Sequence, residues 1–246
     1  MADLSAHETI RQTYDPIHDI GSIIYLSPET FARAAEWGWS NPFSFYFAGR
    51  GGMLGDVAPS VVAATFGWFN PTVVDNMFPE GTAVAGARGA AERMWEAHAL
   101  WGRDHFNDVD LARFVEVADK LVDGAEGSGL PLFVAWRDMP RADDVPARAA
   151  QLFQTLREWR GAVHVVATTA AGLSPRDAIL TNEGEGQAKF FGWTEPFPDV
   201  SADKGKHDEA EDITDRLCAA QVEALLSPAE RADFVAGVTA ARSALD

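Results

Sequence analysis

Five times along this chain, a serine or an asparagine stands directly before a proline. A Ser or Asn side chain accepts hydrogen bonds from the first backbone N–H groups of a helix, and proline fits the first helical position because it lacks an N–H. Each pair therefore predicts the start of a helix. The pairs are Ser27-Pro28, Asn41-Pro42, Asn70-Pro71, Ser174-Pro175 and Ser227-Pro228.

Alanine-rich stretches with apolar residues at helical spacing follow or lie between these starts. The longest are 84–106, 110–123, 145–159 and 209–226. Period-2 alternation, which marks half-buried strands, is almost absent. The best strand candidate is GLPLFVAW, from Gly129 to Trp136, unless it is a buried connector. The sequence therefore predicts a nearly all-α fold.

One local pattern occurs twice. Residues 45–66 and 163–181 each combine a helix of small residues, a break at a Leu-Gly or Gly-Leu pair, and a helix started by proline. Glycine permits the bend and small residues permit close approach, as in a helix-turn-helix unit. Two such units predict an internal duplication. The alternative is chance similarity, which Ala- and Gly-rich helices show easily.

We predict three segments along the chain. The Gly-rich stretch 123–131 separates a first half, residues 1–125, from a second half, residues 126–206. Residues 207–246 form two long C-terminal helices. Apolar rows on those helices predict a two-fold interface, and therefore a homodimer. The rows are Ile213, Leu217, Ala220 and Ala224 on the first helix, and Phe234, Val238 and Ala241 on the second.

The charge of the chain disfavours polyanionic partners. Thirty-seven acidic residues against 20 basic ones give a net charge of −17. Such a chain repels nucleic acid and anionic lipid unless its basic residues gather on one face. They do not gather, because the acidic run HDEAEDITD follows the lysines at 204 and 206. No apolar run is long enough to span a membrane. The single cysteine, Cys218, and the polar opening residues predict a cytoplasmic protein.

Three segments resemble the actinobacterial SalK-like proteins, a family labelled helix-turn-helix or winged-helix. They are YDPIHDIGSIIYLSPE from Tyr14, NPFSFYFAGRGGMLGDVAPSVVAATFGWFNPTVVDNMFPEG from Asn41, and REWRGAVHVVATTAAGL from Arg157. The resemblance covers most of residues 14–193. It implies a duplicated winged-helix fold, similar to that of MarR proteins, and no particular reaction. Residues 194–212 depart from the family pattern at the place of the wing, so we expect an eroded wing.

The two proline-started helices lack the side chains that recognise DNA. A recognition helix needs Arg, Lys, Asn or Gln toward the base edges, and cations toward the phosphates. Residues 59–68 contain no charged side chain. In residues 175–182, Arg176 stands beside Asp177, and two glutamates follow. We therefore expect that specific DNA binding has been lost.

A group of aromatic and basic residues predicts a ligand pocket between the halves. Three of them share one helical face if the helix continues across Pro16, and two more form an i, i+4 pair in an apolar helix. We expect them to surround a cavity for an anionic or aromatic small molecule. The candidate ligand-binding residues are Tyr14, His18, Tyr25, Tyr46, Arg50 and His164.

Arg50 has two possible roles. A cation in an apolar helix needs an acceptor, because an unpaired buried charge is very costly. The acceptor is either a core carboxylate or a bound anion. The ligand hypothesis predicts that Arg50→Met leaves the ligand-free protein about as stable as the wild type. A histidine such as His164 is also found in cores as a structural residue.

Other kinds of site have weaker support. His98 and His105, with Glu92 and Glu96 nearby, predict a solvated helix face better than a metal site. We predict no metal and no cofactor, and haem on His18 or His164 stays open. GRGGMLG does not follow a strand, so it is no nucleotide-binding loop.

The leading hypothesis is a small-molecule-binding protein that resembles a transcription regulator. An enzyme that uses a His/Arg pocket for acid–base chemistry on a small aromatic or anionic metabolite is the alternative. A structural partner for another protein is a third possibility. The sequence assigns no catalytic residue.

Overall fold

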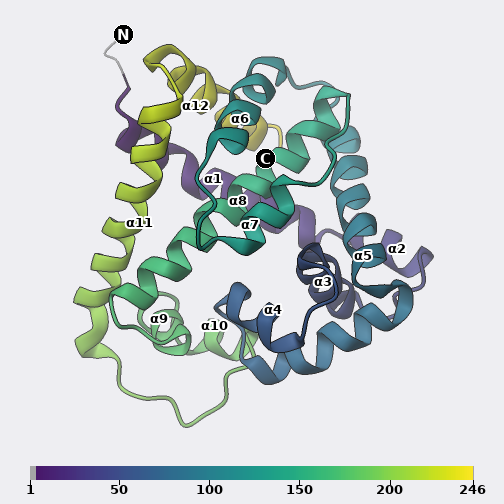
Figure 1. The fold of residues 1–246 in the computed structure, drawn as a ribbon, viewed down its shortest axis with the longest axis vertical. Coiled ribbons are helices and arrows are strands. Elements are labelled where there is room, and N and C mark those ends of the chain that lie inside the picture. Colours follow the sequence, from purple (N-terminus) through teal and green to yellow (C-terminus); the bar gives the residue numbers. More distant parts are fainter. Residues whose placement is uncertain (1–3, 246) are drawn as a thin grey trace.

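The computed structural model describes residues 4–245, and all regular structure in that range is helical. Figure 1 shows helix α8 passing through the middle of the molecule. The helices are α1 (Ala6–Leu26), α2 (Pro28–Glu36), α3 (Pro42–Gly51), α4 (Pro59–Phe66), α5 (Pro71–His105), α6 (Ala112–Gly124), α7 (Pro131–Arg137), α8 (Val145–Ala170), α9 (Pro175–Asn182), α10 (Gly184–Phe190), α11 (Lys204–Leu225) and α12 (Pro228–Ser243), with 3-10 turns η1 (Gly52–Leu54) and η2 (Ser201–Asp203).

All five predicted helix starts are confirmed. The cap side chain accepts a backbone hydrogen bond at α2, α3, α5, α9 and α12. At α12 the capping box is complete, because the Glu230 side chain also accepts from the Ser227 backbone N–H. The four alanine-rich stretches lie within α5, α6, α8 and α11, apart from a residue or two at their ends. Helix α1 runs through Pro16 without ending.

The strand candidate is wrong, because GLPLFVAW forms helix α7. Pro131 occupies the first turn of this helix. Leu132, Phe133 and Trp136 are buried, which is helical spacing within a continuous apolar run. A short run of this kind does not distinguish a buried helix from a buried strand by its pattern alone.

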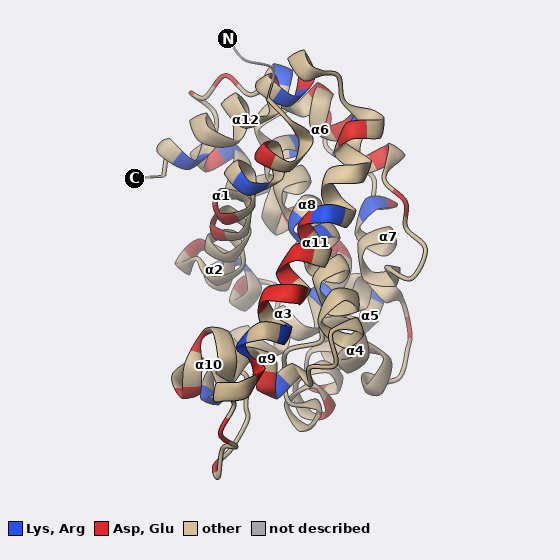
Figure 2. Ribbon diagram, turned by 90° about the vertical axis from the view of Figure 1, so that its left-hand side faces the viewer, with Lys and Arg blue, Asp and Glu red and all other residues tan. Residues whose placement is uncertain are grey.

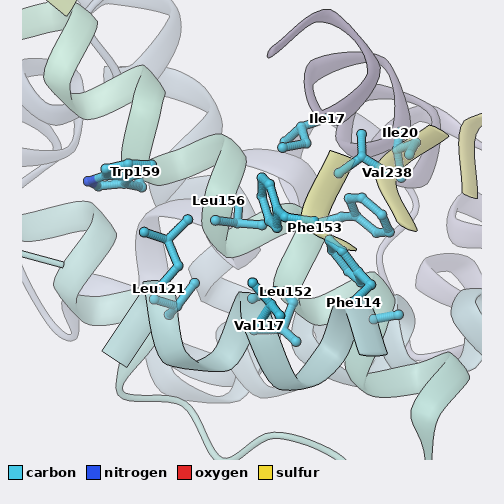
Figure 3. Packing of buried hydrophobic residues seen from close by; sticks show 14 of the residues in the cluster. Ile17, Ile20, Phe114, Val117, Leu121, Leu152, Phe153, Leu156, Trp159 and Val238 are labelled. Atoms are coloured by element: carbon cyan, nitrogen blue, oxygen red, sulfur yellow. The ribbon is translucent and has the colours of Figure 1, made fainter. Parts of the chain in front are cut away.

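Two hydrophobic cores share the central helix α8 as a neighbour. The first core joins α1, α6, α8, α11 and α12. In Figure 3, Phe114 of α6 stacks on Phe153 of α8, with ring centroids 4.4 Å apart. The second core joins α3, α4, α5 and α7. The first core combines segments from both ends of the chain, and the second crosses residue 125 through Leu132 and Trp136 of α7, so the cores do not follow the boundaries at 125 and 206. The three-segment division stays a prediction.

Both predicted bends have a glycine with positive φ before a proline-started helix. Gly55 (φ 82°) lies between α3 and α4, and Gly172 (φ 75°) lies between α8 and α9. The left-handed region suits glycine because it has no Cβ. The helix–bend–helix shape therefore occurs twice, while a common origin of the two units stays a prediction.

The place of the wing holds no β-hairpin. From residue 4 to residue 245 no strand is formed, and residues 194–203 run as an irregular segment with one short 3-10 turn before α11. The erosion of a family wing at this place stays a prediction. The similarity to MarR proteins stays a prediction.

Candidate functional site

A cavity of about 650 Å³ lies where α1, α3, α4, α8, α9 and α11 meet. Volumes of this size are typical of small-molecule sites. Much of its wall is aromatic or aliphatic. Five of the six residues predicted from the sequence line it, and they come from parts of the chain far apart: Tyr14, His18, Tyr46, Arg50 and His164.

Tyr25 does not line this cavity. Its side chain lies in the second core, with 1% of its surface exposed. Its hydroxyl donates a hydrogen bond to Glu158 Oε1 at 3.1 Å. Tyr25 therefore acts behind the cavity wall, where it supports Glu158.

Arg50 forms a buried bidentate ion pair with Glu158. Its Nε and Nη2 each donate to one carboxylate oxygen at 2.9 Å, and Nη1 donates to the Tyr46 hydroxyl at 3.0 Å. Burial opposes the charge on both groups, but their attraction outweighs it. The pKa of Arg50 is therefore raised, and the pKa of Glu158 is lowered. The structure thus supplies a core carboxylate as the acceptor, and Arg50 does not need a ligand to be neutralised.

A second arginine, Arg157, lies beside the same carboxylate. Its Nη1 lies 3.4 Å from Glu158 Oε1, an oxygen already shared by Arg50, Tyr25 and Gln154. Its buried Nε has no hydrogen-bond partner within residues 4–245. One carboxylate thus faces two guanidinium groups, and Asp15 is a second acidic residue on the cavity wall.

His164 lies at another part of the cavity, two helical turns farther along α8. Its Nδ1 is 2.9 Å from Thr214 Oγ1, and that hydroxyl donates its own proton to the Ala210 carbonyl at 2.7 Å. Nδ1 must therefore carry the hydrogen, because the hydroxyl has only acceptor capacity left. In the neutral ring, Nε2 is then a free acceptor. It lies 3.4 Å from Glu211 Oε1.

The environment of His164 disfavours the charged form of its ring. Its pKa is lowered, because burial outweighs the attraction of Glu211. Glu211 is also held by Arg160, whose Nη2 donates to Oε2 at 2.9 Å. The guanidinium of Arg160 lies over the Tyr14 ring, with Cζ 3.3 Å from its centroid. Tyr14 therefore contacts the charged cluster through its ring.

His18 lies at the rim. Its side chain is 48% exposed, and Nδ1 lies 3.9 Å from Asp19 Oδ1. Burial of the remaining part and the nearby charge of Arg157 lower its pKa. His18 and His164 thus line one cavity but are different in kind, since only His164 is enclosed.

Four charged residues that organise the cavity were not predicted from the sequence. Three of them stand together in REWR, within a helix rich in alanine and other apolar residues. Their partners, however, come from distant segments that no local pattern connects. The missed residues are Arg157, Glu158, Arg160 and Glu211.

The expected solvated face at His98 is wrong. Its side chain is fully buried, and Nδ1 lies 2.7 Å from the Met94 carbonyl. Burial lowers the pKa of His98 to about 4. His105 stacks on Trp101, while Glu92 and Glu96 are exposed as expected. Across the described part of the chain, no group of three His, Cys, Asp or Glu side chains is arranged to hold a metal ion.

A model of the helix-turn-helix family matches residues 8–245. The chain belongs to the helix-turn-helix family. Comparisons with curated proteins and with solved structures gave no match. The family assignment therefore rests on the whole length of the sequence.

In this helix-turn-helix protein, the two helices that follow the bends carry little that suits DNA. The exposed residues of α4 include Ser60, Val61 and Ala64, and no charged residue. On α9, Arg176 is paired with Asp177 at 3.0 Å. Figure 2 shows acidic residues along α11. No helix within residues 4–245 is long and apolar enough to cross a membrane.

Proposed function

We propose that this helix-turn-helix family protein binds a small molecule, resembles a transcription regulator in its scaffold, and has lost specific DNA binding. The observation that carries the proposal is the 650 Å³ cavity, which has aromatic walls and separate charged groups. A buried cavity with a few placed polar groups is the usual form of a ligand site. The cavity is lined by residues from distant parts of the chain, from Ile10 on α1 to Phe234 on α12.

The loss of DNA recognition is supported by charge. A specific DNA complex needs several cationic contacts to phosphates and side chains that reach base edges. The net charge of −17 opposes such contacts, and α4 presents no charged side chain. The scaffold of the family is therefore kept without the surface that recognises DNA.

A ligand screen tests the proposal. Native mass spectrometry of the purified protein detects any molecule that stays bound, and thermal shift assays test a metabolite library. A ligand at 100 times its dissociation constant adds about 2.7 kcal/mol to the stability of the fold. The matched control is Gly161→Leu, because a Cβ at Gly161 on the cavity wall meets no atom within 4 Å. Stabilisation of the wild type that is absent in Gly161→Leu supports binding in this cavity.

An enzyme is the second candidate, and the geometry of His164 favours it. An acceptor Nε2 that faces a cavity can take a proton from a bound molecule, as a general base does. Turnover that disappears in His164→Gln, while binding remains, would favour the enzyme. A metabolite that binds and is released without chemical change would favour the binding protein.

Three further assignments belong to this proposal. Within the family, we place the chain in the actinobacterial SalK-like group, and we expect the protein to act in the cytoplasm. We expect a homodimer, because Leu217 of the predicted row is 42% exposed on α11. The site needs no cofactor in this proposal. An absorbance spectrum of the purified protein tests the haem alternative on His18 or His164 directly.

A further inference from the structure

The cavity has two polar ends of opposite hydrogen-bonding character. Both ends lie on helix α8, which supplies Arg157 to one and His164 to the other. Which class of small molecule this cavity selects depends on the proposed function, in which the cavity binds a ligand.

The first end offers donors. Each nitrogen of Arg50 already donates to Glu158 or Tyr46, so a ligand would compete with these bonds. Arg157 lines the cavity, its side chain is 19% exposed, and its hydrogen bond to Glu158 is long, at 3.4 Å. Arginine presents several N–H groups in a plane and suits a carboxylate. At this end a ligand carboxylate can therefore pair with Arg157.

The second end offers acceptors. His164 Nε2 and Glu211 Oε1 lie 3.4 Å apart, and in the neutral ring neither atom has a proton to give to the other. Arg160 holds Glu211 through the other oxygen, Oε2. Two acceptors in such a place are satisfied when a donor lies between or beside them. This end therefore lacks a hydroxyl or an amine.

The wall between the ends is open, and it includes the Tyr14 ring under the Arg160 guanidinium. Arg157 and His164 are seven residues apart, which is about 10 Å along a helix axis and nearly the same helical face. Gly161 lies between them, and a Cβ there meets no atom within 4 Å. The Trp68 ring lies 5.4 Å from the His164 ring on the facing wall. An aromatic or similarly flat body fits between the two ends.

We propose that the cavity binds an elongated, largely apolar carboxylate that carries a hydrogen-bond donor at its far end, with its carboxylate on Arg157 and its donor on His164 Nε2 and Glu211. Hydroxyaryl and aminoaryl carboxylates of the size of a hydroxycinnamate have this form. Both ends contribute to selectivity, because a ligand that lacks either the carboxylate or the donor leaves buried polar groups of the protein unpaired.

A matched set of four probes tests the proposal by titration calorimetry. The probes are 4-hydroxycinnamate, its methyl ester, cinnamate and 4-methoxycinnamate. The hydroxy acid should bind at least about tenfold more tightly than each of the other three, because each lacks one charged or hydrogen-bonding partner. Equal binding of the ester and the acid, or of the methoxy and hydroxy compounds, overturns the proposal.

Two variants assign the ends. In Arg157→Met, the acid and its ester should bind equally while the preference for the hydroxyl remains. In His164→Phe, the hydroxy and methoxy acids should bind equally while the preference for the acid remains. Arg88→Met is the control, because Arg88 is exposed on α5 and pairs with Glu92 outside the cavity. The opposite pattern, or loss of both preferences in each variant, overturns the assignment.

The two proposals can fail separately. If none of the probes binds, but another molecule stabilises the wild type and not Gly161→Leu, the ligand class is wrong and the binding function stands. If no molecule in the library does so, both proposals fail. If 4-hydroxycinnamate binds equally to the wild type and to Gly161→Leu, its site is elsewhere and this inference fails.

Discussion

Arg50 shows how one side chain can belong to both a core and a cavity. Its guanidinium lines the cavity, while its hydrogen bonds go to Glu158 and Tyr46. From the sequence, the acceptor for its guanidinium was either a core carboxylate or a bound anion, and we expected the anion. The structure supplies Glu158, which reverses the expectation for the Arg50→Met variant.

Arg50→Met should lower the free energy of unfolding by about 3–5 kcal/mol, because it leaves Glu158 as a buried charge without its bidentate partner. Urea denaturation measures this change. In the double variant Arg50→Met/Glu158→Gln, more than half of the loss should return, since the stranded charge is gone. A single variant that unfolds at the wild-type urea concentration would contradict the structural role.

His98 should make the fold sensitive to mild acid. Its pKa is about 4 in the folded protein, against 6.5 for an unperturbed histidine. Between these values the unfolded chain binds a proton that the folded chain does not, so stability falls as the pH drops from about 6.5 toward 4. The full effect is roughly 3 kcal/mol. His18 and His164 add to it in the same direction, because their pKa values are also lowered.

Denaturant titrations at pH 7.5 and pH 5 check this dependence. The comparison variant is His98→Gln, which removes the titrating group from the core. Its stability should vary less with pH than that of the wild type, even if it is lower throughout. Equal slopes for both proteins would show that another group controls the acid sensitivity.

The candidate site was predictable in part at the scale of single residues. Histidines and aromatic residues in apolar helices were conspicuous, and five of the six lie at one cavity. The ion pair between Arg50 and Glu158 was not predictable, because the two residues are far apart in sequence and no local pattern connects them. Tyr25 was wrongly predicted to line the cavity. Helical spacing shows that residues share one face of a helix, but it does not show how deeply each of them is buried.

Helices were the most predictable elements, since their starts depend on local chemistry. A Ser or Asn cap before proline decides the first turn within a few residues. Helix α7 was missed because its apolar run is short, and tertiary packing decided its form. On α11 the row predicted for an interface is not part of the core. The buried residues of this helix include Thr214, Cys218 and Val222, while Leu217 is exposed.

Helix α8 contains a glycine that the fold does not require. Gly161→Ala should raise the free energy of unfolding by about 0.5–1 kcal/mol, because alanine is the better helix former and the added Cβ has free space. Thermal unfolding without ligand measures this gain. Gly81→Ala on α5 is the matched control, since its Cβ would collide with the Ser44 carbonyl oxygen. A loss of stability in Gly161→Ala would mean that the wall is closed at this point.

At the scale of the whole molecule, the net charge of −17 opposes the binding of nucleic acids. Specific DNA-binding proteins reach nanomolar affinity at physiological salt through many phosphate contacts. We expect no specific complex with the DNA upstream of its own gene at submicromolar protein in about 150 mM salt. A mobility-shift assay and footprinting measure this. A protected region under those conditions would contradict the proposed loss of DNA recognition.

The predicted homodimer depends on α11, because the row on α12 is used inside the chain. Phe234 and Val238 are buried in the first core. Leu217 remains 42% exposed, so Leu217→Glu should shift the protein from dimer to monomer in light scattering at tens of micromolar. Val61→Glu is the control, since Val61 is 44% exposed on α4. A wild-type monomer at that concentration would contradict the prediction.

The packing of α1 against helices near the other end of the chain affects how the protein is made. Ile10, Ile17 and Ile20 of α1 lie in the core that also contains Phe234 and Val238 of α12. A ribosome adds about 5–20 residues per second, so α1 leaves the exit tunnel on the order of ten seconds before its last partners exist. During that interval the apolar face of α1 cannot pack against its native partners on α12. Folding of this core must therefore wait until α12 has left the ribosome, and until then the exposed apolar face of α1 makes the nascent chain a client for chaperones.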